Sequence, residues 1–259
     1  MFNEYVCKGS KIMLLISRKK MTSLIVLALG VLLLPIQTYS AVRPQLTRIV
    51  AYAEDKETPI AVVNDSQETY LIQSWLEDTK GNDNNLPLVL TPPVMKIGGK
   101  QEGRLRLVIL PTEIPQDRES VYWLSIQEIP PKAKDGGKNK LVLAIRSRLK
   151  VFVRPKGLNG TLASDAVKAL TWTVEREKGA VWLRATNPTP YYVSFGKLEL
   201  KVGGAKGITL EDKTNMPAPM SSWRYAVPKS LKGKSATLTY SAVNDYGGET
   251  EVLNVKITL

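Results

Sequence analysis

The amino-acid sequence is poor in the side chains that most often perform catalysis. It contains no histidine, and its single cysteine is Cys7. A Ser-His-Asp or Cys-His arrangement is therefore impossible, and the commonest metal ligand is missing. A pair of carboxylates, as in glycosidases, stays open in principle, but no motif marks one. We expect no catalytic residue, no metal site and no cofactor, and the sequence favours a binding protein over an enzyme.

Charged residues do gather at one place, in the stretch PQDRESVYWLSIQEIPP from Pro115 to Pro131. Asp117, Arg118 and Glu119 precede a mostly apolar run, and the chemistry open to them is ion pairing. Pro130-Pro131 ends the run, because proline cannot donate a hydrogen bond to a neighbouring strand. The simplest interpretation is an exposed ion pair at the entrance of a strand, worth up to about 1 kcal/mol.

The elements that must position these charges are predicted to be strands. Residues 104–109 begin with strict polar and apolar alternation, and residues 69–78 (TYLIQSWLED) show the same period of two. Residues 58–63 form a short apolar run before a turn, and Pro92-Pro93 interrupts another strand. Residues 170–259 repeat this style, with glycine, asparagine and proline between β-rich segments. Many short strands separated by turns predict an all-β fold built from sandwiches.

The segment LVLAIRSRLKVFVRP, Leu141 to Pro155, places Leu141, Leu143 and Ile145 on one face of a strand. Two interpretations of this apolar row stay open at this point. The row is either the core face of an ordinary strand or an edge that is offered to a partner. Exposed edges attract pairing and are normally guarded by charge. The charges suited to guard this edge are Lys138, Lys140, Arg146 and Arg148.

Residues 1–40 have the pattern of a cleaved signal peptide. A basic stretch, residues 18–20, precedes the uncharged apolar run LIVLALGVLLL, Leu24 to Leu34. This run is shorter than the roughly 20 residues that a membrane span needs, so we expect a leader and not an anchor. Small or modest side chains predict cleavage after Ser40. The start codon stays open among Met1, Met13 and Met21.

Leader removal would change both the charge and the redox chemistry of the chain. The leader holds five of the 36 Lys/Arg and one of the 24 Asp/Glu residues, so the net charge falls from +12 to +8. Cys7 also leaves, so we expect no disulfide, although an exported chain meets an oxidising compartment. The remaining basic residues are scattered, with no basic tail or aromatic-basic patch, so we expect no nucleic-acid partner.

Four motifs taken together resemble the periplasmic chaperones that assemble pili. They are PQDRES…EIPP, the Thr47-Arg48 pair, NPTPYYV at Asn187–Val193 and NDYGG at Asn244–Gly248. The resemblance covers residues 41–259. It implies two immunoglobulin-like β-sandwich domains set at an angle with a cleft between them. The expected hinge at Arg154-Pro155-Lys156-Gly157 divides them into residues 41–155 and 156–259. In this family the chaperone lends a strand to an incomplete pilin sandwich.

The resemblance also implies a role for single residues. Arg48 and Lys150 match the cleft cations that hold the terminal carboxylate of the pilin, which is a charge-assisted contact. Leu141, Leu143 and Ile145 match the row that fills the pilin groove. Glu119, Arg154 and Asp245 match ion pairs across the domain junction.

The remaining expectations concern the partners of the protein, its branch of the family and the alternative function. The resemblance implies capture of pilin subunits in the periplasm, delivery to an outer-membrane usher, and a possible self-capping dimer of the free protein. It implies no insertion in the membrane. The short loop Lys132–Lys140 and the absence of flanking cysteines indicate the short-loop branch of the family. The alternative is an exported two-domain adhesion or carbohydrate-binding protein.

Overall fold

The computed structural model describes residues 41–132, 143–210 and 215–259, all within one compact unit of the chain. The expected leader at residues 1–40, Leu141 of the apolar row, and residues 133–140 of the expected loop lie outside the described residues. Within the described residues, no helix is both long and apolar enough to cross a membrane.

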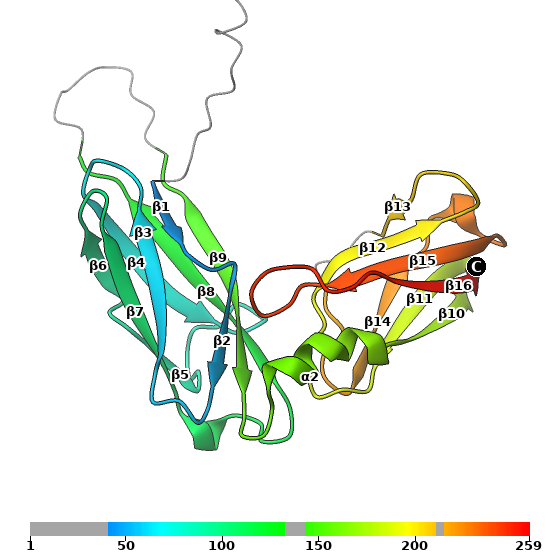
Figure 1. Cartoon of the computed structure of the whole chain (residues 1–259), viewed down its shortest axis with the longest axis horizontal. Coiled ribbons are helices and arrows are strands. Elements are labelled where there is room, and N and C mark those ends of the chain that lie inside the picture. The colour runs from blue at the N-terminus through cyan, green and yellow to red at the C-terminus, as the bar shows by residue number, and fades with distance from the viewer. Residues whose placement is uncertain (1–40, 133–142, 211–214) are drawn as a thin grey trace, which may run out of the picture. The chain divides into compact units, whose positions relative to one another are not determined.

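The first half of the described chain is a sandwich of two sheets (Figure 1). The strand order is β1-β3-β7-β5 in one sheet and β2-β9-β8-β4-β6 in the other. The strands are β1 (Val42–Pro44), β2 (Arg48–Tyr52), β3 (Thr58–Asn64), β4 (Tyr70–Glu77), β5 (Leu88–Thr91), β6 (Val94–Ile97), β7 (Glu102–Ile109), β8 (Ser120–Ile129) and β9 (Arg146–Arg154).

The predicted period of two explains this sandwich. Along β7 the apolar residues Leu105, Leu107 and Ile109 are buried, while the residues between them are more exposed. They pack in one core with Leu124 of β8 and Val151 of β9. Pro92-Pro93 lies between β5 and β6, and the chain passes there from one sheet to the other. The interruption expected from the two prolines is therefore the point where the chain changes sheets.

Strand β9 is paired unequally on its two sides. Against β8 it pairs antiparallel from Arg146 to Val153, whereas β2 pairs with it in parallel from Lys150 to Arg154 only. Before Lys150, no described strand pairs with β9 on the β2 side. We use the term open edge of β9 for residues 143–149, which are the three described residues before the strand and its first four residues.

The second half of the described chain forms another sandwich, with strand orders β10-β11-β14 and β13-β12-β15-β16. The all-β fold class with two β-sandwiches is thus confirmed. The strands are β10 (Thr171–Glu177), β11 (Ala180–Asn187), β12 (Phe195–Lys201), β13 (Ile208–Thr209), β14 (Ser221–Ala226), β15 (Ser235–Ala242) and β16 (Leu253–Thr258). Trp172, Phe195, Tyr225 and Tyr240 pack against one another in its core.

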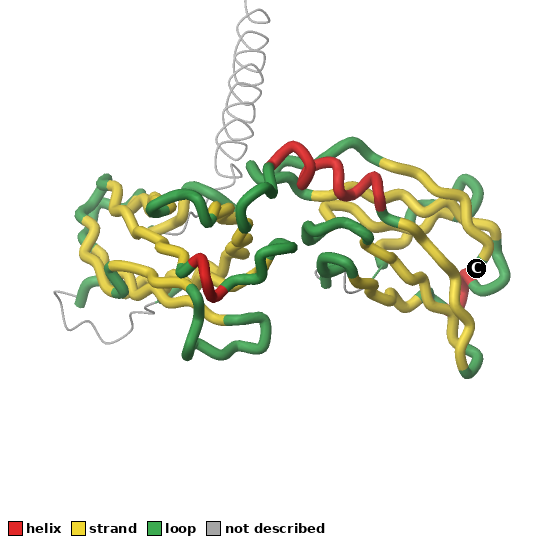
Figure 2. Tube along the Cα trace, turned by 90° about the horizontal axis from the view of Figure 1, so that it is seen from below, coloured by secondary structure: helices red, strands yellow, loops and turns green. Residues whose placement is uncertain are grey.

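A short helix, α2 (Gly160–Asp165), precedes the second sandwich and was not expected from the sequence. Asn159 caps it, because its side-chain oxygen accepts a hydrogen bond of 3.0 Å from the N–H of Leu162. Figure 2 shows how little of the described chain is helical. Each sandwich has its own core. The described buried core residues of the first end at Val153, and those of the second begin at Ala166.

Candidate functional site

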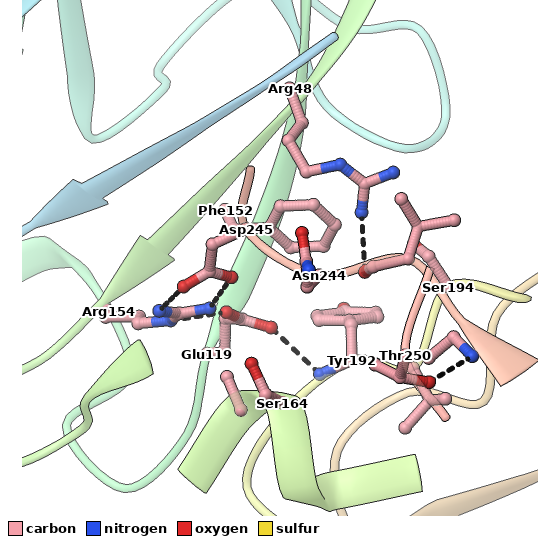
Figure 3. Close-up of a pocket in the computed structure, with 14 residues that line it drawn as sticks. Arg48, Glu119, Phe152, Arg154, Ser164, Tyr192, Ser194, Asn244, Asp245 and Thr250 are labelled. Atoms are coloured by element: carbon pink, nitrogen blue, oxygen red, sulfur yellow. Dashed lines mark hydrogen bonds and ion pairs between the residues drawn. The ribbon is translucent and has the colours of Figure 1, made fainter. Parts of the chain in front are cut away.

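Arg48 and Lys150 lie side by side because β2 and β9 pair in parallel with these two residues in register. Arg48 Nη1 donates a hydrogen bond of 2.9 Å to the carbonyl oxygen of Val243. Lys150 Nζ donates one of 3.3 Å to Ser194 Oγ and lies 3.1 Å from Met216 Sδ. Figure 3 shows Arg48 above Phe152 and Ser194, at the edge of a small pocket of about 20 Å³.

Neither cation has a carboxylate within ion-pair distance among the described residues. Arg48 Nε is also buried without a hydrogen-bond partner there. Burial lowers the pKa of Arg48, and burial together with the nearby Arg48 charge lowers the pKa of Lys150 to about 8. Two partly buried cations that form no ion pair with any described carboxylate make a site that favours an anion. A carboxylate could accept charge-assisted hydrogen bonds from both.

Arg154 lies at the centre of a buried ion cluster (Figure 3). Its side chain is only 2% exposed, and its Nε donates to Glu119 Oε1 at 2.8 Å. Its two terminal nitrogens donate to both oxygens of Asp245 at 2.7 Å. Glu119 Oε2 accepts a further hydrogen bond of 2.8 Å from the N–H of Tyr192. The cluster therefore joins residues of the first sandwich to two segments of the second.

The surroundings in the ion cluster shift the pKa values of Glu119 and Arg154. Burial raises the pKa of Glu119 to about 7, against the lowering effects of Arg154 and the Tyr192 N–H. Burial alone would lower the pKa of Arg154, but the hydrogen bonds and charges of Asp245 and Glu119 outweigh it and raise the value. We therefore take Arg154 as permanently charged, with Asp245 as its more exposed partner.

Two turns of the second sandwich position the partners of these cations. In NDYGG, the Asn244 side-chain oxygen accepts hydrogen bonds of 3.0 Å from the N–H groups of Tyr246 and Gly248. Gly247 has a φ of 87°, which favours glycine. This turn holds Asp245 toward Arg154 and the preceding Val243 carbonyl toward Arg48. The resemblance assigned Asp245 of this motif to an ion pair, and the structure adds the preceding Val243 carbonyl as a partner of Arg48.

The second motif, NPTPYYV, works through a buried asparagine. Asn187 Nδ2 donates to the carbonyl oxygens of Tyr191, Pro217 and Ala218 at 2.6 to 3.1 Å. These bonds fix the loop that carries Tyr192, whose N–H reaches Glu119. The loop also carries Tyr191, whose ring faces the Arg154 guanidinium at 5.5 Å.

The described part of the apolar row is exposed. Leu143 and Ile145 are 68% and 44% exposed, whereas Leu149, farther along the same face of β9, is 3% exposed. Leu141 lies outside the described residues. Burial begins where β2 and the core cover the strand, so the row lies at the open edge.

Glu128, near the end of β8, is a site residue to which the sequence analysis gave no role. It is 4% exposed, and its Oε1 accepts a hydrogen bond of 3.3 Å from the N–H of Ile145. Its Oε2 accepts one of 2.9 Å from the N–H of Val42. The Glu128 N–H donates in turn to the Ile145 carbonyl at 3.0 Å. Glu128 thus fixes the start of the open edge against β8, which no sequence pattern had indicated.

The two arginines expected to guard the edge do not lie over it. Arg146 and Arg148 both turn across β8, where they meet tryptophan rings and the carboxylate of Glu77. No group of His, Cys, Asp and Glu residues in the described part of the chain could hold a metal ion. The described site is built from the two cations, the open edge with its apolar side chains, and the carboxylates of Glu119, Glu128 and Asp245 that hold these parts in place.

Comparison with known proteins identifies the family. Residues 41–159 match the family described as "Pili and flagellar-assembly chaperone, PapD N-terminal domain". Residues 165–253 match "Pili assembly chaperone PapD, C-terminal domain". The chain belongs to the pilus assembly chaperones. The resemblance inferred from the four motifs is thereby confirmed, and the alternative of an adhesion or carbohydrate-binding protein is not favoured. The family role is that of a chaperone, which is not an enzymatic one.

Curated relatives agree with this assignment. The "Probable fimbrial chaperone YadV" of Escherichia coli K12 is 38% identical over 217 residues, which cover 79% of this chain and 85% of that protein. The "Chaperone protein FimB/FhaD" of Bordetella pertussis is 39% identical over 215 residues, 79% of this chain and 83% of that protein. The pilus chaperone is therefore similar to fimbrial chaperones along most of its length.

Solved structures agree as well. A crystal structure of the YadV chaperone has a TM-score of 0.70 at 34% identity and covers 84% of this chain and 100% of its own. The CupB2 chaperone of Pseudomonas aeruginosa has a TM-score of 0.66 at 30% identity, with the same coverage. These matches do not distinguish the branches of the family, so the short-loop assignment stays a prediction.

Proposed function

We propose that this pilus chaperone captures pilin subunits in the periplasm by lending them the open edge of β9. The observation that carries the proposal is the position of Arg48 and Lys150. These two cations have no counterion among the described residues, and they lie where the open edge meets β2. A strand that pairs with the open edge and ends there would place its terminal carboxylate on both cations.

Each part of the site has a role in this proposal. The backbone of residues 143–149 supplies hydrogen bonds to the incoming strand. Leu143 and Ile145, with Leu141 before them, supply apolar side chains for the groove of the incomplete subunit. Arg48 and Lys150 bind the carboxylate. The ion cluster of Glu119, Arg154 and Asp245 holds the Val243 turn, and hence one partner of Arg48, in place.

The remaining proposals follow from the family and from the leader. We propose that residues 1–40 are removed on export and that the two domains divide between Pro155 and Lys156. Captured subunits would be delivered to an outer-membrane usher. The free protein would cover its open edge by forming a dimer, since an exposed edge attracts pairing.

The test is identification of the bound partner. The full chain is expressed with its leader, purified from periplasmic extract, and the co-purifying proteins are identified by mass spectrometry. We expect a pilin subunit with the wild type and none with Lys150→Met, which keeps an unbranched side chain only one atom shorter but loses its charge. A wild type that brings down no pilin, or equal recovery with Lys150→Met, would contradict the proposal.

A further inference from the structure

The outward side chains of β9 before Lys150 are Arg146 and Arg148, and both are held by residues of the next two strands. The pairing register places Arg146 opposite Gln127 and Arg148 opposite Ser125 of β8. It places Trp75 and Glu77 of β4 opposite Ser125 and Trp123 of β8. One face of the sheet therefore carries tryptophan, glutamate and arginine side chains from three adjacent strands.

The contacts on this face form a ladder of stacked and paired groups. The Arg146 guanidinium lies 4.5 Å from the centre of the Trp75 ring, and that of Arg148 lies 4.4 Å from the Trp123 ring. Glu77 Oε2 joins them, 3.1 Å from Arg146 Nη2 and 3.2 Å from Arg148 Nη2. Arg146 Nη2 also donates to Ser125 Oγ at 2.7 Å. We call this set, which is Trp75, Glu77, Trp123, Arg146 and Arg148, the arginine ladder.

The arginine ladder lies entirely on one side of β9. Every partner that the structure gives to the two guanidinium groups belongs to β8 or β4. Those strands lie on one side of β9, and the open edge lies on the other. Both arginines are therefore drawn away from the edge that they were expected to guard.

Holding the two arginine side chains in this position costs conformational entropy, which only specific contacts offset. Both side chains are more than 40% exposed, so they would otherwise sample many rotamers, including those that extend over the edge. A cation above an aromatic face and a shared carboxylate each contribute modestly at such exposure. Charged side chains over an edge strand oppose pairing with another chain. Their removal from the edge leaves its backbone groups accessible.

We propose that Trp75, Trp123 and Glu77 are positioning residues that keep Arg146 and Arg148 off the open edge, so that the edge is ready to pair with an incoming strand. This inference rests on the proposed function, since it concerns the same edge. It assigns the ladder a role in the rate of capture. A purely structural role would instead affect the stability of the sheet.

The test measures association with a synthetic probe. The probe is a peptide of about ten alternating valine and threonine residues, with lysines at its amino end for solubility and a free carboxyl end. Stopped-flow fluorescence gives the association rate constant for the wild type and for Glu77→Gln. We expect the rate constant to fall about fivefold in Glu77→Gln, because the freed arginines reach the edge. The melting temperature should change little.

A rescue variant distinguishes an effect on the position of the two arginines from an effect on the stability of the sheet. In Glu77→Gln with Arg146→Gln and Arg148→Gln, no charge is left to extend over the edge, so association should return to the wild-type rate. The matched control is Glu177→Gln in the second sandwich. There Arg224 also lies over a tryptophan, Trp182, at 5.2 Å and pairs with Glu177 at 3.0 Å. This control should bind the peptide at the wild-type rate.

The outcomes are distinct. A wild type that does not bind the peptide, or that binds its carboxyl-terminal amide equally well, would contradict the proposed function. A wild type that binds the free acid, together with an unchanged rate in Glu77→Gln, would overturn the positioning role alone. A slow Glu77→Gln variant that the two arginine substitutions do not restore would also overturn it.

Discussion

At the scale of single residues, Lys150 couples the site to pH. Its pKa is lowered from 10.5 to about 8 by burial and by Arg48, so this charge is half lost in the free protein at about pH 8. A bound carboxylate stabilises the charged form and therefore raises the pKa of Lys150 in the complex. Binding is then linked to proton uptake above pH 8.

We therefore expect capture to weaken in alkaline solution. Affinity for a strand with a free carboxyl end should be nearly constant below about pH 7 and fall by up to about tenfold per unit well above pH 8. Fluorescence titration of the peptide probe across this range measures it. Lys150→Met should bind more weakly and without this slope, and a persistent slope in that variant would assign the titration to another group.

The charged stretch before β8 contains two acids with different surroundings. Glu119 is buried against Arg154, whereas Asp117 pairs with Arg118 at the surface. Loss of one partner from a buried pair leaves a buried charge uncompensated. The run of three adjacent charges does not by itself indicate which one turns inward, because that depends on the partner segments at Tyr192 and Asp245. Only the family resemblance pointed to Glu119.

These two acids give a matched comparison of stability. Glu119→Ala should lower the free energy of unfolding by about 3 kcal/mol or more, because Arg154 would lose a buried counterion. Asp117→Ala should change it by less than about 0.5 kcal/mol. Urea denaturation measures both variants. Equal effects would show that the cluster contributes no more than an exposed ion pair.

At the scale of elements, the side chains on one face of β9 and the residues before it change from exposed to buried along the strand. The alternation of the sequence correctly puts Ile145 and Leu149 on one face, but it cannot show that burial starts between them. That limit is set by β2, which pairs with β9 only from Lys150 onward. The contact between Glu77 and the two arginines was also unpredictable, because it requires the register of three strands.

Two substitutions on this face distinguish a position at the exposed edge from a position in the core. Leu143→Glu should leave the melting temperature nearly unchanged, since an exposed position usually contributes within about 0.5 kcal/mol, and should abolish capture of pilin. Leu149→Glu should unfold the first sandwich, because it buries a charge. A thermal melt and a pull-down are run on each variant. The melt is repeated at several protein concentrations, since stabilisation by a dimer depends on concentration.

A large fall in the melting temperature of Leu143→Glu, independent of concentration, would show that the row belongs to the core. The row would then be unavailable to a partner, and capture by the open edge would have to be abandoned.

At the scale of the whole molecule, each sandwich has a separate core, and described hydrogen bonds and ion pairs connect them. Strand content, sheet-breaking prolines and the family were accessible from the sequence, because period two and four spaced motifs are local patterns. Helix α2 was missed, since it comprises only six residues and shows no sustained helical period.

The exported form of the molecule can be tested directly. We expect the chain to begin at Ala41, since the apolar run at residues 24–34 is too short to remain as a span. Mass spectrometry of the intact protein from periplasmic extract gives the terminus. A protein that retains this run and fractionates with membranes would contradict the leader assignment.

Because Arg48 pairs with Lys150 in register, the two cations lie at a fixed distance from the apolar side chains of the open edge. Between Ile145 and Lys150 the strand advances five residues, about 17 Å. A chain whose last atoms are fixed on the two cations must present its apolar side chains at a set number of residues from its end. One inserted residue would turn them all to the wrong face. The site would therefore select the number of residues between the carboxyl end and the apolar side chains of a bound chain. Different sequences with this same spacing would bind equally well.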